Sequence, residues 1–244
     1  NLFADFVDIA LEEIADQGVV QFIVPLSIAF SRDYAALRQK MRLGHYAVDL
    51  SSFDNIPDTL FKAGKPRHTN TNKANSQRCS IITIAPARRF QLRSSGLIRW
   101  RRRERQTVLS APTPLLDASL YEFDGQFPRP ANSKILDYLR LSEQSPRFGE
   151  RINARGRFPI FVAGVARNFI GLRMNEGAGC TRLGFSSATE RLKFALLLSS
   201  DLFFDYWLTV GDGFHLTKSN ITSFPLSDKL DSILDLHVQA MDEI

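Results

Sequence analysis

The sequence predicts an α/β protein of two domains, and three observations lead to that prediction. The chain has 244 residues, which is more than one typical domain needs and enough for two small ones. Its first part alternates helical and strand-like patterns, as α/β proteins do. Residues 88–105 then hold eight arginines and a single acid, Glu104, before an Ala-Pro-Thr-Pro stretch at 111–114. We therefore expect one domain at residues 1–110 and a second at residues 111–244.

The first elements are an amphipathic helix and a buried strand. Apolar side chains from Leu2 to Ile14 recur at helical spacing, and Gly18 is a suitable helix stop. The short, nearly continuous apolar run at 19–24 is typical of a strand that is buried on both faces of a parallel sheet. Pro25 is expected to end that strand.

A second helix and two more strands follow in the first domain. Ser31 can cap a helix that extends through Arg42. Residues 46–50 and 79–84 have the pattern of short strands. The polar stretch 62–77 between them is predicted to be a long mobile loop.

The second half predicts a less regular, mixed α+β domain. Ser187 and Glu190 form a capping box that opens one long helix, which we expect to continue through Tyr206. The other expected elements are a helix at 133–141, strands at 158–162 and 168–172, a turn at 211–213 and a final helix from residue 228.

Composition and charge narrow the function classes. The net charge of +5 and the pI of about 9.4 favour an anionic partner, such as nucleic acid or a membrane surface. The most apolar long stretch, 192–208, contains Asp201 and Asp205, so we expect no membrane span. Cys79 and Cys180 lie far apart, and no Cys/His cluster has zinc spacing. We therefore expect no metal site and a reducing, cytoplasmic location.

Several stretches share the pattern of one enzyme family. In the first half they are Asn1-Leu2-Phe3-Ala4-Asp5-Phe6 through Gly18, Phe22-Ile23-Val24-Pro25, Arg38 in Tyr-Ala-Ala-Leu-Arg, and Phe53-Asp54-Asn55-Ile56-Pro57 with Leu60-Phe61 and Arg78-Cys79-Ser80-Ile81-Ile82. Through them residues 1–86 resemble the C-terminal segment of the catalytic domain of amino-methylating (N6-adenine) DNA methyltransferases from type II and type I restriction–modification systems. The second half resembles a DNA target-recognition domain, through Gly211-Asp212-Gly213, Leu216, Ile221 and Phe224-Pro225-Leu226.

The resemblance implies a fold, a cofactor and a partner. The fold would be the C-terminal portion of a Rossmann-like class I methyltransferase sheet, followed by the target-recognition domain. The intact enzyme would flip an adenine out of double-stranded DNA and methylate its amine from S-adenosylmethionine.

The chain departs from the family at the chemical centre. It has neither the Gly-rich loop for S-adenosylmethionine nor the Asn/Asp-Pro-Pro-Tyr/Phe tetrapeptide, and it contains no Pro-Pro pair. In the family both precede the stretch that Asn1 begins. Because the chain also starts directly in a helical pattern without Met, we interpret it as the C-terminal part of the enzyme. We expect no catalytic or cofactor-binding residue in it and no methylation by this chain alone. A missing N-terminal methylase segment or a separate subunit would supply both.

An arginine cluster is the first candidate site for DNA. Its members, which surround Trp100, are Arg99, Arg101, Arg102, Arg103 and Arg105. Such a segment can neutralise several phosphates and would make binding steeply salt-dependent. Trp100 is expected either to stack or to anchor the segment. The alternative is a solvated basic connector.

Two further groups are candidates. Phe61 and His68 are predicted to contact the extruded base, the alternatives being a core position for Phe61 and a surface loop position for His68. His215 and Lys218 flank a tight turn that can reach a groove edge, the alternative being an ordinary surface hairpin. Arg167 joins them as a DNA-binding candidate, with Asn168 and Arg173 as weaker ones.

Two rival functions remain open at this stage. The first is a non-enzymatic DNA-specificity module that partners a separate methylase chain and binds duplex DNA without a cofactor. The second is a methyltransferase that acts on RNA or protein, because a fold alone does not fix the substrate.

Overall fold

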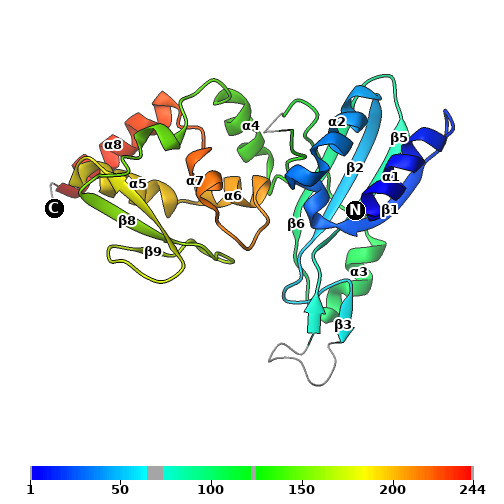
Figure 1. Cartoon of the computed structure of the whole chain (residues 1–244), viewed down its shortest axis with the longest axis horizontal. Helices are drawn as coiled ribbons and strands as arrows, with labels where there is room; N and C mark the ends of the chain where they lie inside the picture. Colours follow the sequence, from blue (N-terminus) through cyan, green and yellow to red (C-terminus); the bar gives the residue numbers. More distant parts are fainter. Residues whose placement is uncertain (1, 65–73, 122–124, 243–244) are drawn as a thin grey trace. The chain divides into compact units, whose positions relative to one another are not determined.

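The structure is a computed structural model, which describes residues 2–64, 74–121 and 125–242 and divides into two units (Figure 1). Unit 1 comprises Asn1–Asn132 and unit 2 comprises Ser133–Ile244. Unit 1 contains a mixed five-stranded sheet and unit 2 a three-stranded sheet, each with helices. The predicted α/β class is therefore confirmed at the level of a mixed α/β protein.

Unit 1 is built from short strands and helices in the order expected of its first part. Its elements are α1 (Leu2–Glu13), β1 (Val20–Pro25), η1 (Leu26–Ala29), η2 (Arg32–Tyr34), α2 (Ala35–Leu43), β2 (Tyr46–Phe53), β3 (Lys62–Gly64), β4 (Ala74–Ser76), β5 (Cys79–Pro86), β6 (Gln91–Ile98), η3 (Arg102–Glu104), α3 (Arg105–Ser110) and β7 (Leu116–Asp117).

The five-stranded sheet is mixed rather than parallel. Its strand order is β1-β5-β2-β6-β7, with β5 antiparallel to both neighbours and β2 parallel to β6. The predicted strands at 19–24 and 79–84 lie in this one sheet and pair directly, Val20 with Ile84 and Pro25 with Cys79. The expectation of a parallel arrangement is corrected, because β5 returns antiparallel between β1 and β2. The expected burial of β1 on both faces is also corrected, since β1 is an edge strand whose Ile23 is 55% exposed.

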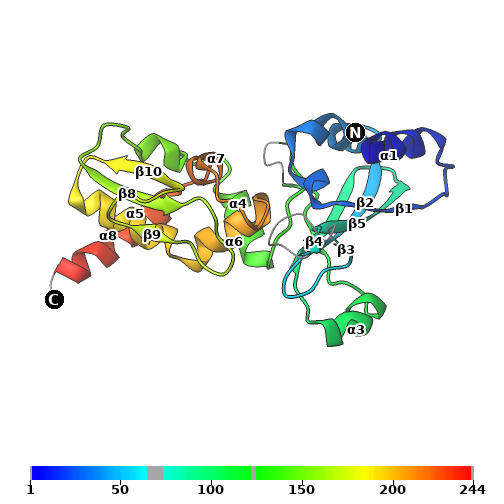
Figure 2. The ribbon, with the colours of Figure 1, turned by 60° about the horizontal axis from the view of Figure 1, so that its bottom comes forward.

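The core of unit 1 lies between the sheet and its helices. Figure 2 shows α1 on one face of the sheet. Val7 and Leu11 of α1 and Met41 of α2 pack there against Leu50 of β2 and Ile82 of β5. This packing explains the helical spacing in α1, because burial of its apolar stripe is what stabilises a short helix.

Residues 111–132 belong to unit 1, so the expected boundary at 110/111 lies inside that unit. β7 pairs with β6, and Phe127 is buried in the same core. Arg38, itself buried, donates from Nε to the Gly125 carbonyl over 2.7 Å and from Nη1 to the Ile28 carbonyl over 2.8 Å. Burial lowers the pKa of Arg38 to about 10. The Ala-Pro-Thr-Pro stretch is thus a connection within one unit.

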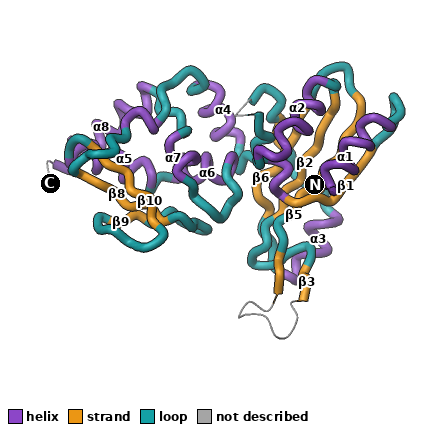
Figure 3. The backbone as a smooth tube through the Cα atoms, viewed as in Figure 1, coloured by secondary structure: helices purple, strands orange, loops and turns teal. Residues whose placement is uncertain are grey.

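Unit 2 combines a small antiparallel sheet with helices. Its elements are α4 (Ser133–Leu141), η4 (Phe148–Arg151), β8 (Phe158–Ala163), β9 (Leu172–Arg173), β10 (Cys180–Phe185), α5 (Ala188–Leu198), α6 (Asp201–Val210), α7 (Lys218–Thr222) and α8 (Asp228–Asp242). The strand order is β10-β8-β9, and Figure 3 shows these strands side by side.

Serine caps explain where α5 and α6 of unit 2 begin. The predicted cap at Ser187 is confirmed, because its hydroxyl accepts from the Glu190 amide over 3.0 Å. The predicted single long helix is wrong: Ser200 caps a new helix, α6, by accepting from the Phe203 amide over 3.2 Å. Serine favours such caps over helix interiors, which is why the chain breaks there. Within the described ranges, no helix has both the length and the apolar character that crossing a membrane requires.

Candidate nucleic-acid interface

Three strands of unit 1 end at the same edge of the sheet. Cys79, at the start of β5, is aligned with Pro25 of β1 and Phe53 of β2, and Phe53 is aligned with Ile98 of β6. The chain leaves this edge into the β3–β4 hairpin and, after β6, into α3 (Figure 1). We call residues 53–61, 78–79 and 98–110 the basic edge.

A buried carboxylate organises the basic edge. Asp54 is fully buried, and its two carboxylate oxygens accept from Nε of Arg78 over 2.7 Å and from Nε of Arg99 over 2.8 Å. Its own amide donates to the Ile98 carbonyl over 2.9 Å. One negative charge thus binds two guanidinium groups, so Arg99 has a structural partner, and 30% of its side chain remains exposed.

Trp100 anchors the arginine cluster. Its side chain is 2% exposed and packs edge-on against Phe53, with ring centroids 5.5 Å apart. It shares a small core with Leu60 and Cys79. Of the two roles expected for Trp100, stacking on a ligand and anchoring, the structure shows anchoring.

The arginines after Trp100 are exposed. Arg101, Arg102 and Arg103 lie on the turn that leads into α3, where Glu104 accepts from the Arg101 amide over 2.8 Å. The Arg103 guanidinium is 3.7 Å from Glu104 and the side chain is 75% exposed, so this pair neutralises little charge. Arg105 donates to the Leu60 carbonyl over 2.9 Å and so ties α3 to the start of the hairpin. The segment presents several cations on a fixed backbone.

The base-pocket candidates are only partly described. Phe61 is 51% exposed, so the alternative of a core position is wrong for it. His68 lies outside the described residues, as does most of the expected loop. The described flanks of that stretch form the β3–β4 hairpin, in which Lys62 pairs with Ser76.

In unit 2 the structure brings two separately predicted stretches together. Val165 and His215 form a β-bridge, and the Ala166 amide donates to the Phe214 carbonyl over 2.8 Å. The Arg167 guanidinium lies 4.7 Å from the centre of the Phe214 ring. Arg167 and His215 are therefore neighbours, and exposed Lys218 follows at the first position of α7.

His215 has an acidic partner. Its Nδ1 lies 2.6 Å from a carboxylate oxygen of Asp212, whose other oxygen accepts from the Phe214 and His215 amides. The turn at 211–213 is thus held by the same acid that orients the imidazole. Arg173, one of the weaker candidates, is exposed on β9, where it pairs with Phe161.

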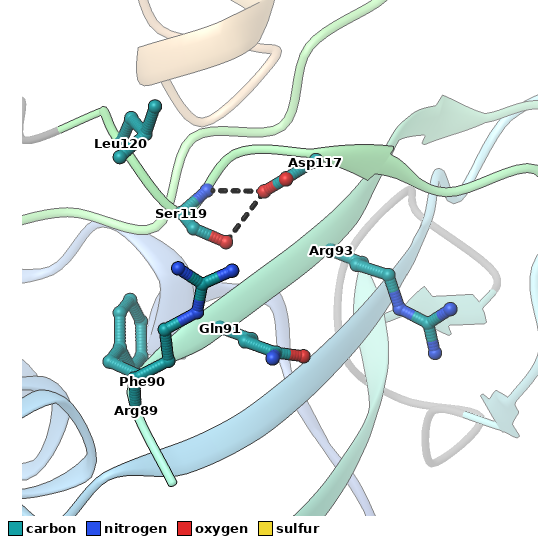
Figure 4. A pocket seen from close by; sticks show the side chains of 7 residues that line it. All are labelled: Arg89, Phe90, Gln91, Arg93, Asp117, Ser119 and Leu120. Carbon is teal, nitrogen blue, oxygen red and sulfur yellow. Dashed lines mark hydrogen bonds between the residues drawn. The ribbon is translucent and has the colours of Figure 1, made fainter. Parts of the chain in front are cut away.

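A cavity of about 400 Å³ lies at the amino end of β6, away from the basic edge that follows its carboxyl end (Figure 4). Its lining residues are Arg89, Phe90, Gln91, Arg93, Asp117, Ser119 and Leu120. Arg93 is paired with Asp49 of β2. Hydrogen bonds from the Ser119 hydroxyl and amide, and then the charge of Arg89, hold the pKa of Asp117 below its usual value. Sequence patterns do not reveal this cavity, because Asp117, Ser119 and Leu120, which complete its lining, lie outside the arginine-rich stretch.

No protein-family model matches the chain, and no curated protein matches it. In the described part of the chain, no three His, Cys, Asp or Glu side chains gather as a metal site requires. Among solved structures, 18 chains are similar. One is the cryo-EM structure of a DrdV–DNA complex, with 14% sequence identity and a TM-score of 0.35. The similarity covers 47% of this chain and 12% of that chain, so this chain spans a small part of that protein's length.

Proposed function

We propose that this chain is the C-terminal, DNA-binding part of a site-specific adenine-N6 DNA methyltransferase of a restriction–modification system. The observation that carries the proposal is the basic edge. There, exposed Arg101, Arg102 and Arg103 stand on a turn that buried Trp100 fixes, beside the carboxyl ends of β1, β2 and β6. Guanidinium groups bind phosphate oxygens in a bidentate manner, and a fixed turn reduces the entropic cost of binding.

The topology of unit 1 supports the methyltransferase part of the proposal. β1 and β2 run in the same direction with β5 antiparallel between them, and β1 has one edge without a strand partner among the described residues. The flank beside that edge is apolar: Phe6 and Ile9 of α1 are 57% and 56% exposed, and Val19 is 65% exposed. In the proposed enzyme, further strands of the methylase sheet cover this flank. They also bring the cofactor loop and the tetrapeptide that grips adenine.

The sequence lacks the Gly-rich loop that holds S-adenosylmethionine in the family it resembles, and it lacks the adenine-gripping tetrapeptide. We therefore assign no chemical step to this chain. Its role is to bind phosphates and to read sequence, which offsets the few kcal/mol that extruding a base costs.

Duplex binding as a function of salt tests the proposal. The chain should bind a DNA duplex, and log K should fall linearly with log salt concentration. Replacing Arg101, Arg102 and Arg103 with Ala should flatten that slope by roughly 0.9 for each phosphate that the variant no longer neutralises. The matched control replaces exposed Arg32, Arg140 and Lys229, which removes the same charge elsewhere. An unchanged slope in the first variant, or an equal change in the control, would remove the basic edge from the interface.

A second candidate function is a non-enzymatic DNA-specificity module that partners a separate methylase chain. Arg167, His215 and Lys218 favour it, because all three lie in unit 2, where Arg167 is stacked on Phe214 and His215 is bridged to Val165. The coding sequence upstream separates the two candidates. An Asn-Pro-Pro-Tyr tetrapeptide a few tens of residues before Asn1 supports the enzyme, and its absence favours the module. A methyltransferase for RNA or protein would instead show no preference for duplex DNA.

A further inference from the structure

We propose that the loop of residues 164–171 in unit 2 inserts Phe169 between DNA bases while Arg167 binds a neighbouring phosphate. The inference rests on the proposed function, because it needs duplex DNA as the partner. It goes further by assigning base contact to an apolar side chain that the sequence patterns did not single out.

The loop of residues 164–171 presents two exposed apolar side chains. Phe169 is 72% exposed and Val165 is 52% exposed, and both lie within the same connection between β8 and β9. Isolated exposed apolar residues are common on protein surfaces. The distinguishing features here are the fixed backbone of the loop and the Arg167 guanidinium that it carries.

The backbone of the loop is held at both ends. The Ala163 amide donates to the Gly171 carbonyl over 2.8 Å, and the Leu216 amide donates to the Gly164 carbonyl over 3.0 Å. Ala166 and Ile170 are buried at 2% and 9% exposure, and they bracket the exposed residues 167–169. Because its neighbours are anchored, Phe169 is directed outward by a loop that loses little entropy when it binds.

The charges around Phe169 fit a nucleic acid. Arg167 is stacked on Phe214, and His215 is bridged to Val165, so two nitrogen-rich side chains border the same loop. The nearby acid, Asp212, is engaged by the His215 ring and by two backbone amides. Side chains of this kind combine in proteins that insert apolar wedges between base steps and bind the adjacent phosphates.

Phe169→Ala tests the inference. Removing the aromatic ring from the bases should weaken binding to a short mixed-sequence duplex by roughly tenfold. The salt slope should stay unchanged because no charge is removed. The matched control is Phe6→Ala, which truncates an aromatic side chain of similar exposure, 57%, in unit 1 and should leave affinity unchanged.

Phe169→Trp adds a spectroscopic readout. The native tryptophans, Trp100 and Trp207, are 2% and 0% exposed, so iodide should quench the indole introduced at 169 far more than theirs. Duplex DNA should shield the introduced indole from iodide and quench its emission by stacking.

The outcomes separate the two proposals. If the wild-type chain does not bind duplex DNA, the proposed function fails. If the wild type binds but Phe169→Ala binds equally well, or if DNA leaves the introduced indole open to iodide, only the role of Phe169 is overturned. A protein partner at this loop would give that second result.

Discussion

Replacing Asp54 with Asn should destabilise unit 1 more than most single substitutions. Asp54 is fully buried and binds Arg78 and Arg99, whose side chains are 13% and 30% exposed. Removing one partner of a buried ion pair typically costs about 3–5 kcal/mol, because the remaining charges stay desolvated. Both arginines retain some solvent, so we expect the lower end, about 3 kcal/mol. For a unit of this size that loss corresponds to a fall in the unfolding midpoint of roughly 10 °C.

Calorimetry with a compensating variant tests this reasoning. The transition of unit 1 should move while that of unit 2 stays in place, because Asp54 lies within unit 1. Adding Arg99→Met to Asp54→Asn should recover part of the loss, since it removes one of the two uncompensated charges. If Asp54→Asn lowers the free energy of unfolding by less than about 0.5 kcal/mol, as ordinary surface changes do, the assigned role of Asp54 is refuted. A double variant no more stable than the single one would also refute it.

Three further predictions concern single side chains. Burial raises the pKa of the Cys79 thiol, so Cys79 should resist alkylation in the folded protein while the partly exposed Cys180 reacts, as mass spectrometry of labelled peptides would show. Ser119→Ala should raise the lowered pKa of Asp117 toward its usual value of 3.8, which a carbon-detected NMR titration would measure. In the wild type, the stability that this carboxylate contributes is present above about pH 4 and is lost as the pH falls through its folded-state pKa. The variant should therefore lose less stability in acid than the wild type. Lys193 is 6% exposed and joins α5 to two aspartates of α8. Replacing it with Met should lower the free energy of unfolding of unit 2 by about 2 kcal/mol, as measured by urea unfolding.

Several elements of unit 1 could be predicted, but the directions of its strands could not. Apolar periodicity places α1, β1, β2 and β5 close to their observed positions, because the side chains that form the pattern are the ones that pack in the core. Strand direction depends on which strands pair, and an apolar run such as residues 19–24 is the same in either direction. The boundary fails for a similar reason. Proline marks where a helix or strand stops, whereas the burial of Phe127 in the first core decides to which unit its segment belongs.

The candidate site shows the same division between local and distant information. Local sequence identifies Arg101, Arg102 and Arg103 as a basic turn, because a short segment with one acid cannot neutralise its own charge. It does not show that Trp100 is buried. It also does not show that Arg167 and His215 are neighbours, because that contact joins stretches almost fifty residues apart through a β-bridge.

We expect the acids that the fold brings to each arginine to determine which arginines bind phosphate. The Arg93 guanidinium is paired with Asp49 of β2, and the Arg99 guanidinium with buried Asp54. The acid near Arg101, Glu104, instead accepts from the backbone amide of Arg101. An arginine that already has an acidic partner attracts a DNA phosphate weakly, because the two opposite charges of the pair largely cancel. Replacing Arg101 with Ala should therefore lower the salt slope of duplex binding, whereas Arg93→Ala and Arg99→Ala should change it little. Arg99→Ala should lower the free energy of unfolding instead, since it removes one of the two guanidinium groups that bind the buried Asp54 carboxylate. An equal decrease of the slope in all three variants would show that total charge, rather than the pairing of each arginine in the fold, controls binding.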